Sequence, residues 1–183
     1  MNLGLDISTS IIGVCLFDND SFVLMDKIDL TKTKCIFEKA KRVENYFDKL
    51  SSDHNITNIY IEDILQAFRR GMSSSKTLMQ LARFNGVVSN IVFRSCGLIP
   101  VYINVNTARK LLEIKIDKNS VIDKKEQVLN WVNEDLGGYN WPEKIISRGK
   151  NKGLVKFEKF CYDMSDSYVI CKAGIKLNNG YHK

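Results

Sequence analysis

The sequence has few of the residues that build disulfide frameworks and soft-metal sites. It contains two histidines, His54 and His182, and five cysteines without a Cys-x-x-Cys pair. That odd number and spacing fit neither a disulfide framework nor a zinc site, so we expect reduced, mostly packed thiols. No apolar run approaches the length of a membrane span, and the N-terminus lacks a signal-type leader. We therefore expect a cytoplasmic protein.

The charge balance is basic. The 183 residues include 27 Lys and Arg against 21 Asp and Glu, a net charge of +6. This balance favours a polyanionic partner over an acidic protein or a small metabolite. With 44% hydrophobic residues, the chain is long enough for one sizeable core and short for two domains. We expect a single domain over residues 1–183.

The first part of the chain predicts a three-stranded antiparallel meander. Residues 3–7 and 11–17 are apolar, β-rich runs joined by a Ser-Thr-Ser turn, and residues 21–29 form a third alternating run. The only charged residue of the first run is Asp6, where the strand ends. A carboxylate buried there is costly unless a cation compensates it, and a metal ion is the usual compensator.

A second carboxylate follows a second buried strand. Residues 33–50 have the apolar stripe of an amphipathic helix, and residues 56–61 then form a short strand that ends at Glu62. Parallel pairing of this strand with the first would bring Glu62 beside Asp6 at one edge of the sheet. The alternative is that Glu62 begins a solvated loop.

The middle of the chain predicts further helices and one more strand. A long helix over residues 76–94 contains Gly86, where we expect another element to approach closely. A strand at 98–103 and a short helix around 108–112 follow. Asp123 and Glu126 then have the spacing of a helix capping box.

The last predicted helix runs from Tyr162 to Ala173 and begins with two acids. Asp163 and Asp166 are three residues apart, which places them on one helix face. The helix dipole also favours negative charge in a first turn, so capping is an alternative role, for Asp163 especially. Capping explains one of these acids better than both.

Residues 139–159 form a basic insertion with little regular pattern. Trp141-Pro142 lies among lysines and an arginine, and acids are few. Interleaved basic and aromatic residues can follow a phosphate backbone and stack on bases. A solvated loop explains the same composition equally well.

Together, Asp6, Glu62, Asp163 and Asp166 predict an oxygen-rich metal site. Such ligands suit hard divalent cations such as Mg²⁺, with Mn²⁺ as a substitute, and argue against Zn²⁺. Two such ions about 4 Å apart can activate a water and stabilise the leaving oxygen in phosphodiester hydrolysis. In a basic chain, this centre predicts a nuclease.

The order of these parts resembles the RNase H-like superfamily and, within it, the RuvC-type Holliday junction resolvases. Leu3-Gly-Leu-Asp6 with Gly13 looks like the first motif of that family, Ile59-Tyr-Ile-Glu62 like the second and Asp163-Met-Ser-Asp166 like the third. The resemblance covers nearly the whole chain. It implies an α/β fold whose five-stranded mixed sheet, a three-strand antiparallel meander plus two parallel strands, is flanked by helices. It also implies that the four acids are metal ligands.

The resemblance further implies a homodimer that cleaves four-way DNA junctions. Lys125 matches the family's basic residue near the scissile phosphate, where it would neutralise developing charge; a solvated first-turn lysine is the alternative. Phe68 falls where the family carries an aromatic wedge, and a packed core phenylalanine is equally compatible. The other expected DNA contacts are Arg69, Arg70, Arg109, Lys110, Lys124, Arg148, Lys150 and Lys152.

Two features depart from the family pattern. The glycine that usually lies two residues after the first Asp is replaced by Ser8. The basic insertion at 139–159 is longer than in bacterial members and looks more like phage or viral ones. The resemblance therefore implies work at the nucleoid or at a site of phage or viral DNA replication.

Three other functions share parts of this pattern. Other RNase H-like nucleases cut RNA/DNA hybrids or other branched DNA with the same carboxylate centre, so the acids do not separate these substrates. A non-catalytic DNA-binding module would also be basic. The first hairpin resembles the phosphate-binding turn of actin-like ATPases and sugar kinases, but those proteins need two such domains and the glycine that Ser8 replaces.

Overall fold

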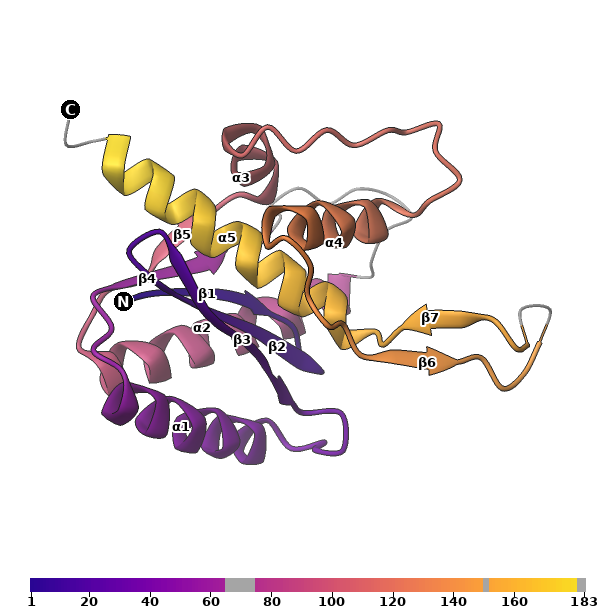
Figure 1. Ribbon diagram of the computed structural model, residues 1–183. Helices are drawn as coiled ribbons and strands as arrows, with labels where there is room; N and C mark the ends of the chain where they lie inside the picture. Colours follow the sequence, from indigo (N-terminus) through magenta and orange to yellow (C-terminus); the bar gives the residue numbers. More distant parts are fainter. Residues whose placement is uncertain (65–74, 150–151, 181–183) are drawn as a thin grey trace.

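A five-stranded mixed sheet lies at the centre of the computed structural model, which describes residues 1–64, 75–149 and 152–180 (Figure 1). The strands are β1 (Asn2–Ile7), β2 (Ile11–Asp18), β3 (Ser21–Asp29), β4 (Asn58–Glu62) and β5 (Val101–Ile103). Their order is β3-β2-β1-β4-β5. The first three strands are antiparallel, and β4 and β5 continue the sheet in parallel with β1. The predicted fold class is confirmed.

Helices cover both faces of the sheet. α1 (Ile36–Asp53) and α2 (Ser75–Cys96) lie on one face, and α5 (Phe160–Gly180) crosses the other (Figure 1). α3 (Val105–Leu111) and α4 (Lys124–Asp135) pack against α5. No helix among the described residues is both long and apolar enough to cross a membrane.

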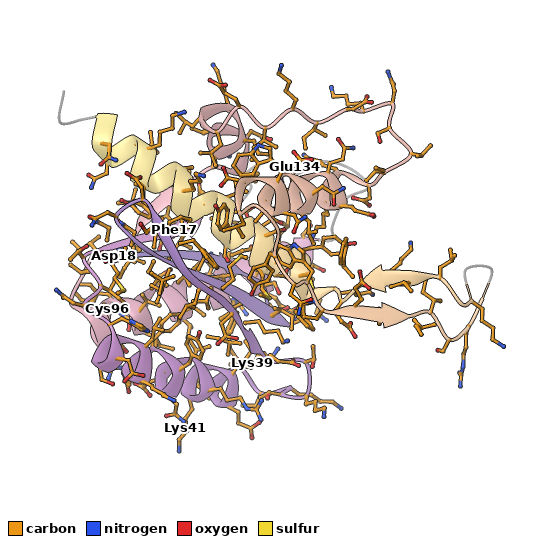
Figure 2. The ribbon with its side chains drawn as sticks, viewed as in Figure 1. Phe17, Asp18, Lys39, Lys41, Cys96 and Glu134 are labelled. Atoms are coloured by element: carbon orange, nitrogen blue, oxygen red, sulfur yellow. The ribbon has the colours of Figure 1, made fainter. Side chains whose placement is uncertain are left out.

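The alternation of side chains in the strands separates two apolar clusters. Leu3, Leu5 and Ile7 of β1 pack with residues of α1 and α2. Phe17 of β2, labelled in Figure 2, belongs to the other cluster. Its ring lies 5.1 Å from that of Tyr168 on α5. The alternation of β1 places Gly4 and Asp6 on this second face, because successive strand residues point to opposite sides.

Two glycines let α5 lie directly on the central strands. A Cβ atom at Gly4 would be 2.3 Å from the Cβ of Cys171, and one at Gly13 would be 2.0 Å from the carbonyl oxygen of Asp163. Gly13 is also the register partner of Asp6. Any side chain at these positions would therefore push the N-terminal half of α5 away from Asp6. The close approach predicted at Gly86 was wrong, because a Cβ there meets no atom within 4 Å.

The turn after Asp6 is organised by a serine hydroxyl. Ser8 Oγ donates a hydrogen bond of 2.7 Å to the carbonyl oxygen of Ile11 and accepts from the backbone N–H groups of Ser10 and Ile11. A side chain that bonds to nearby backbone groups in this way stabilises a tight turn. Ser8 therefore stabilises this turn at the position where the family pattern has a glycine.

Part of the basic insertion forms a second, two-stranded sheet. β6 (Glu143–Ile145) pairs antiparallel with β7 (Val155–Phe157), and this hairpin extends away from the helices and the main sheet (Figure 1). We call it the β6–β7 arm. A solvated loop was one of the two expectations for this segment; each strand is only three residues long, too short to show a strand pattern in the sequence.

The cysteines are free thiols, as expected. Cys15, Cys161 and Cys171 are buried in the cluster beneath α5, whereas Cys35 is exposed.

Candidate metal centre

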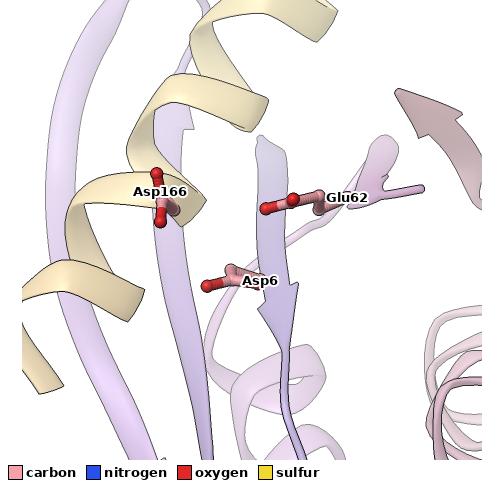
Figure 3. Close-up of side chains that lie close together, drawn as sticks. All are labelled: Asp6, Glu62 and Asp166. Carbon is pink, nitrogen blue, oxygen red and sulfur yellow. The ribbon is translucent and has the colours of Figure 1, made fainter. Parts of the chain in front are cut away.

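Three of the four predicted carboxylates meet at one edge of the sheet. Asp6 comes from β1, Glu62 from the end of β4 and Asp166 from α5, and one oxygen of each lies within 4.8 Å of the others (Figure 3). The parallel register that pairs Leu5 with Ile61 places Asp6 and Glu62 on neighbouring strands one residue further along. Asp166 is buried, and the other two carboxylates are partly exposed.

Asp163 lies one helical turn before Asp166. It is not among the three carboxylates that share the tight cluster. It is nevertheless close enough for its charge to raise the pKa of Asp6. Loss of solvation raises the pKa of Asp163 itself to about 6. The structure thus places Asp163 beside the cluster, and its role as a metal ligand stays a prediction.

Removal from water and mutual repulsion disfavour the ionised carboxylates. Loss of solvation raises the pKa of Glu62 to about 7, and the charge of Asp166 adds to this effect. The pKa of Asp6 is also raised, first by loss of solvation and then by the charges of Glu62, Asp166 and Asp163. A cation placed among these groups would reverse both effects, since it favours the charged forms.

Arg109 supplies one positive charge from within the protein. Its Nη2 lies 3.4 Å from Oδ1 of Asp166, and its side chain is 11% exposed. This guanidinium lowers the pKa values of Asp166 and Glu62 against the effect of burial. Its Nε is buried and has no hydrogen-bond partner in the described part of the chain. Sequence reasoning missed this ion pair, and the predicted contact of Arg109 with DNA stays a prediction.

Lys125 lies beside the same centre. It is in the first turn of α4, where its backbone N–H donates to the carboxylate of the N-cap Asp123. Its charge lowers the pKa values of all four acids: Asp6, Glu62, Asp163 and Asp166. The side chain is exposed. The structure therefore brings this predicted residue close to the carboxylates, while its catalytic role stays a prediction.

The remaining predicted DNA contacts fall into three groups. Lys124 is exposed next to Lys125, and its charge also lowers the pKa of Asp166. Lys110 on α3 and Arg148 and Lys152 in the β6–β7 arm are exposed as well. Phe68, Arg69, Arg70 and Lys150 lie outside the described residues.

The donor set fits a hard divalent cation. Every ligand atom of the cluster is a carboxylate oxygen, and no histidine or cysteine belongs to it. Mg²⁺ and Mn²⁺ prefer such oxygen ligands, whereas Zn²⁺ is more often held by nitrogen and sulfur. Arg109 and Lys125 do not fully balance these carboxylates, because the pKa values of Asp6 and Glu62 remain raised. Asp6, Glu62 and Asp166 are therefore the residues that would hold a metal ion.

Comparison with solved structures identifies the fold. No protein-family model and no curated protein sequence matched the chain. Thermus thermophilus RuvC in complex with a Holliday junction substrate is 13% identical with a TM-score of 0.66, covering 97% of this chain and 94% of that one. A second structure of Thermus thermophilus RuvC is 14% identical with a TM-score of 0.61, over 97% and 95%. The yeast mitochondrial Holliday junction resolvase Ydc2 is 14% identical with a TM-score of 0.53, over 97% and 78%. The chain therefore has the fold of the RuvC-type resolvases.

Proposed function

We propose that this protein is a metal-dependent endonuclease that cleaves four-way DNA junctions by phosphodiester hydrolysis. One observation carries the proposal: a tight cluster of carboxylates lies at the sheet edge of a RuvC-type fold. The net charge of +6 suits a polyanionic substrate. The similar RuvC structure that contains a Holliday junction supports the choice of substrate.

In this proposal, Asp6, Glu62 and Asp166 hold Mg²⁺ or Mn²⁺, and Asp163 completes the ligands for a second ion. Two bound ions would polarise the scissile phosphate, lower the pKa of the attacking water and stabilise the leaving oxygen. The protein supplies ligands that come from three different elements, so that their spacing is set by the packing of α5 on the sheet.

Two basic residues act on this centre without binding the metal. Arg109 holds Asp166 in place through their ion pair, and its charge opposes the rise in the pKa of Asp166 that burial causes. Lys125, exposed beside the carboxylates, neutralises charge that develops on the scissile phosphate. Lys125 would thus be the catalytic cation, and Arg109 a positioning residue.

The proposed DNA surface continues from this edge of the sheet to the β6–β7 arm. Lys110, Lys124, Arg148 and Lys152 are exposed. In this proposal they contact phosphates, and contacts of this kind give sequence-independent affinity. The chain would act as a homodimer, because two active sites suit the two-fold symmetry of a four-way junction. Such substrates place the protein at the nucleoid or at a site of phage or viral DNA replication.

Cleavage of labelled substrates tests the proposal. Wild type and Asp6→Asn would be compared on a four-way junction, a flap, a linear duplex and an RNA/DNA hybrid in Mg²⁺. We expect wild type to cut the junction in preference, and Asp6→Asn to bind it without cutting. Preference for the hybrid would instead support a ribonuclease. Binding without cleavage by wild type, in either Mg²⁺ or Mn²⁺, would support a non-catalytic DNA-binding module.

A further inference from the structure

A second, basic site lies near the carboxylate centre. A hollow of about 400 Å³ is lined by Lys34, Lys39 and Arg83, together with the polar residues Thr9 and Gln80. Its volume is within the range of ligand sites, about 300–1,000 Å³. The cations come from three places in the chain: the segment before α1, the first turn of α1 and the first half of α2. Their convergence is therefore produced by the tertiary fold.

These three cations have no acidic partner in the described part of the chain. No salt bridge within residues 1–64, 75–149 and 152–180 involves Lys34, Lys39 or Arg83. None of the described residues that line the hollow is acidic. Like charges gathered in one hollow repel one another, and an anion bound among them would remove that repulsion. The chemistry of the hollow thus selects an anionic ligand.

One of the cations is held in a fixed direction. Lys39 Nζ donates a hydrogen bond to the carbonyl oxygen of Thr9 and lies 5.9 Å from the ring centroid of Phe84. Figure 2 shows Lys39 on the side of α1 toward the sheet, while Lys41 points away from the sheet into solvent. A cation held in this way is preorganised for a ligand, because less side-chain freedom is lost on binding.

The hollow reaches the edge of the sheet where Asp6 lies through one lining residue, Thr9. Lys39 and Arg83 come from α1 and α2, which cover the face opposite α5 (Figure 1). Thr9 belongs to the turn between β1 and β2, three residues after Asp6. A strand of nucleic acid that follows this edge would therefore pass from one site to the other. The positive hollow would attract the backbone, whereas the carboxylates alone would repel it.

We propose that this hollow binds a backbone phosphate of the DNA strand that enters the carboxylate centre. The proposal rests on the proposed nuclease function and adds a specific anchor for the strand. Arg83 is able to bind two phosphate oxygens with its planar guanidinium, and the lysines act as point charges. Gln80 and Thr9 offer neutral donors. One anchored phosphate would fix the register of the strand, and so the distance from the anchor to the bond that is cut.

A phosphate-neutralisation scan tests this anchor. Junctions that carry a single uncharged methylphosphonate at successive backbone positions would be bound by wild type and by Lys34→Gln/Arg83→Gln, in Ca²⁺ to suppress cleavage. For wild type we expect one position near the cut site to cost about tenfold in affinity or more, the effect of a lost charge-assisted contact. The double variant should bind the unmodified junction with similarly reduced affinity and no longer respond at that position.

A matched control separates the anchor from general charge. Lys41→Gln/Lys49→Gln removes the same number of charges from exposed positions on α1 outside the hollow. This control should keep the response at the sensitive position. Circular dichroism would confirm that the exposed substitutions leave the fold intact.

The outcomes distinguish this inference from the proposed function. Junction binding by the double variant with an unchanged response at every position would overturn the phosphate anchor and leave the nuclease proposal in place. Failure of wild type to bind any junction would overturn both. A loss of response in the control as well would show only a general effect of charge, and would also reject the anchor.

Discussion

The two faces of the central sheet are built for different tasks. The face covered by α1 and α2 is packed with large aliphatic and aromatic side chains, among them Leu5, Val43 and Phe47. The face under α5 contains glycines where the helix approaches most closely, and it carries the carboxylates at its edge. The first arrangement serves only to bury apolar surface, which the α5 face also does with Phe17 and Tyr168. The second brings a helix close enough to place acids from α5 beside acids from the strands.

This difference predicts that stability and activity respond to different substitutions. Apolar burial dominates the free energy of folding, so substitutions in the α1–α2 face, which carries no member of the carboxylate cluster, should change stability and leave the chemistry of the site unchanged. Carboxylates removed from water and close to one another oppose folding unless a cation is bound. The α5 face should therefore control activity, and its acids should destabilise the metal-free protein. The following predictions run from the largest expected effect to the smallest.

Substitution of a strand-end carboxylate should abolish cleavage without unfolding the protein. For Asp6→Asn we expect junction cleavage to fall on the order of 10³-fold or more, because the proposed metal ligand is lost. The thermal midpoint without metal should stay equal or rise, since one repelling charge is gone. Single-turnover cleavage and calorimetry check both parts. Activity equal to wild type would reject the metal assignment.

Truncation on the opposite face should have the reverse outcome. Phe47 is fully buried against the sheet, and Phe47→Ala should lower the free energy of unfolding by about 3–5 kcal/mol. Cleavage per folded molecule should stay near the wild-type rate at a temperature where the variant remains folded. Urea unfolding and active-site titration measure these quantities. A specific loss of activity at full folding would contradict the division between the faces.

A methyl group added at Gly13, beneath α5, should show whether the close packing of this helix on the sheet is needed for cleavage. Gly13→Ala places a Cβ against the backbone of Asp163, so α5 must shift away from Asp6. We expect cleavage to fall about 10–100-fold, as for groups that orient metal ligands, together with weaker Mg²⁺ activation. Gly86→Ala is the matched control, because its Cβ meets open space and alanine favours a helix. Equal activity in the two variants would show that the close approach is unnecessary.

The stability of the metal-free protein should fall as pH rises. Loss of solvation raises the pKa of Glu62 to about 7 and that of Asp163 to about 6, so the folded state holds protons that the unfolded state has released. The stability that these two groups contribute is therefore fully present below their unfolded pKa values, and it is lost as pH rises through about 6 to 7. In EDTA, the thermal midpoint should drop between about pH 5 and pH 8.

Two controls assign this pH effect to the carboxylate centre. Mg²⁺ should reduce the drop, because a bound cation stabilises the ionised acids. Glu62→Gln should flatten it, since this side chain, whose pKa of about 7 is above that of Asp163, is then uncharged throughout. A midpoint that rises steadily from pH 5 to pH 8 in EDTA would contradict the electrostatic account.

Removal of charge from the β6–β7 arm should have the smallest effect. Arg148→Ala/Lys152→Ala should weaken junction binding a few-fold and reduce the dependence of affinity on salt, by roughly 0.9 in log–log slope for each lost phosphate contact. Thermal stability should not change, because both side chains are exposed. Anisotropy titrations at several salt concentrations measure the slope. A slope equal to that of wild type would show that the arm does not contact phosphates.

Much of the fold and three members of the site could be predicted from the sequence. The meander was predictable because alternation and turn residues act locally, and β3 has the predicted bounds, Ser21–Asp29. The neighbouring positions of Asp6 and Glu62 followed from the rule that parallel strands end at the same edge. Asp166 followed from its spacing of three residues from Asp163 at the start of a predicted helix, which places both on one face.

The features that were missed depend on packing between distant segments. The ion pair between Arg109 and Asp166 joins residues 57 positions apart, and no local pattern indicates it. The sequence does not reveal which of Gly4 and Gly86 is packed closely against another element. In the structure, a Cβ atom at Gly4 would meet α5, whereas one at Gly86 would meet no atom within 4 Å. The basic hollow likewise combines side chains from separate elements, so composition alone could not distinguish its cations from ordinary surface charge.

The order in which the carboxylates occur along the chain also bears on synthesis. Asp6 and Glu62 leave the ribosome early, whereas the helix that carries Asp166 follows about a hundred residues after Glu62. A nascent chain therefore has no complete cluster until α5 has emerged and docked. If the proposed function holds, the nascent chain would lack nuclease activity until α5 has docked on the sheet and brought Asp166 beside Asp6 and Glu62.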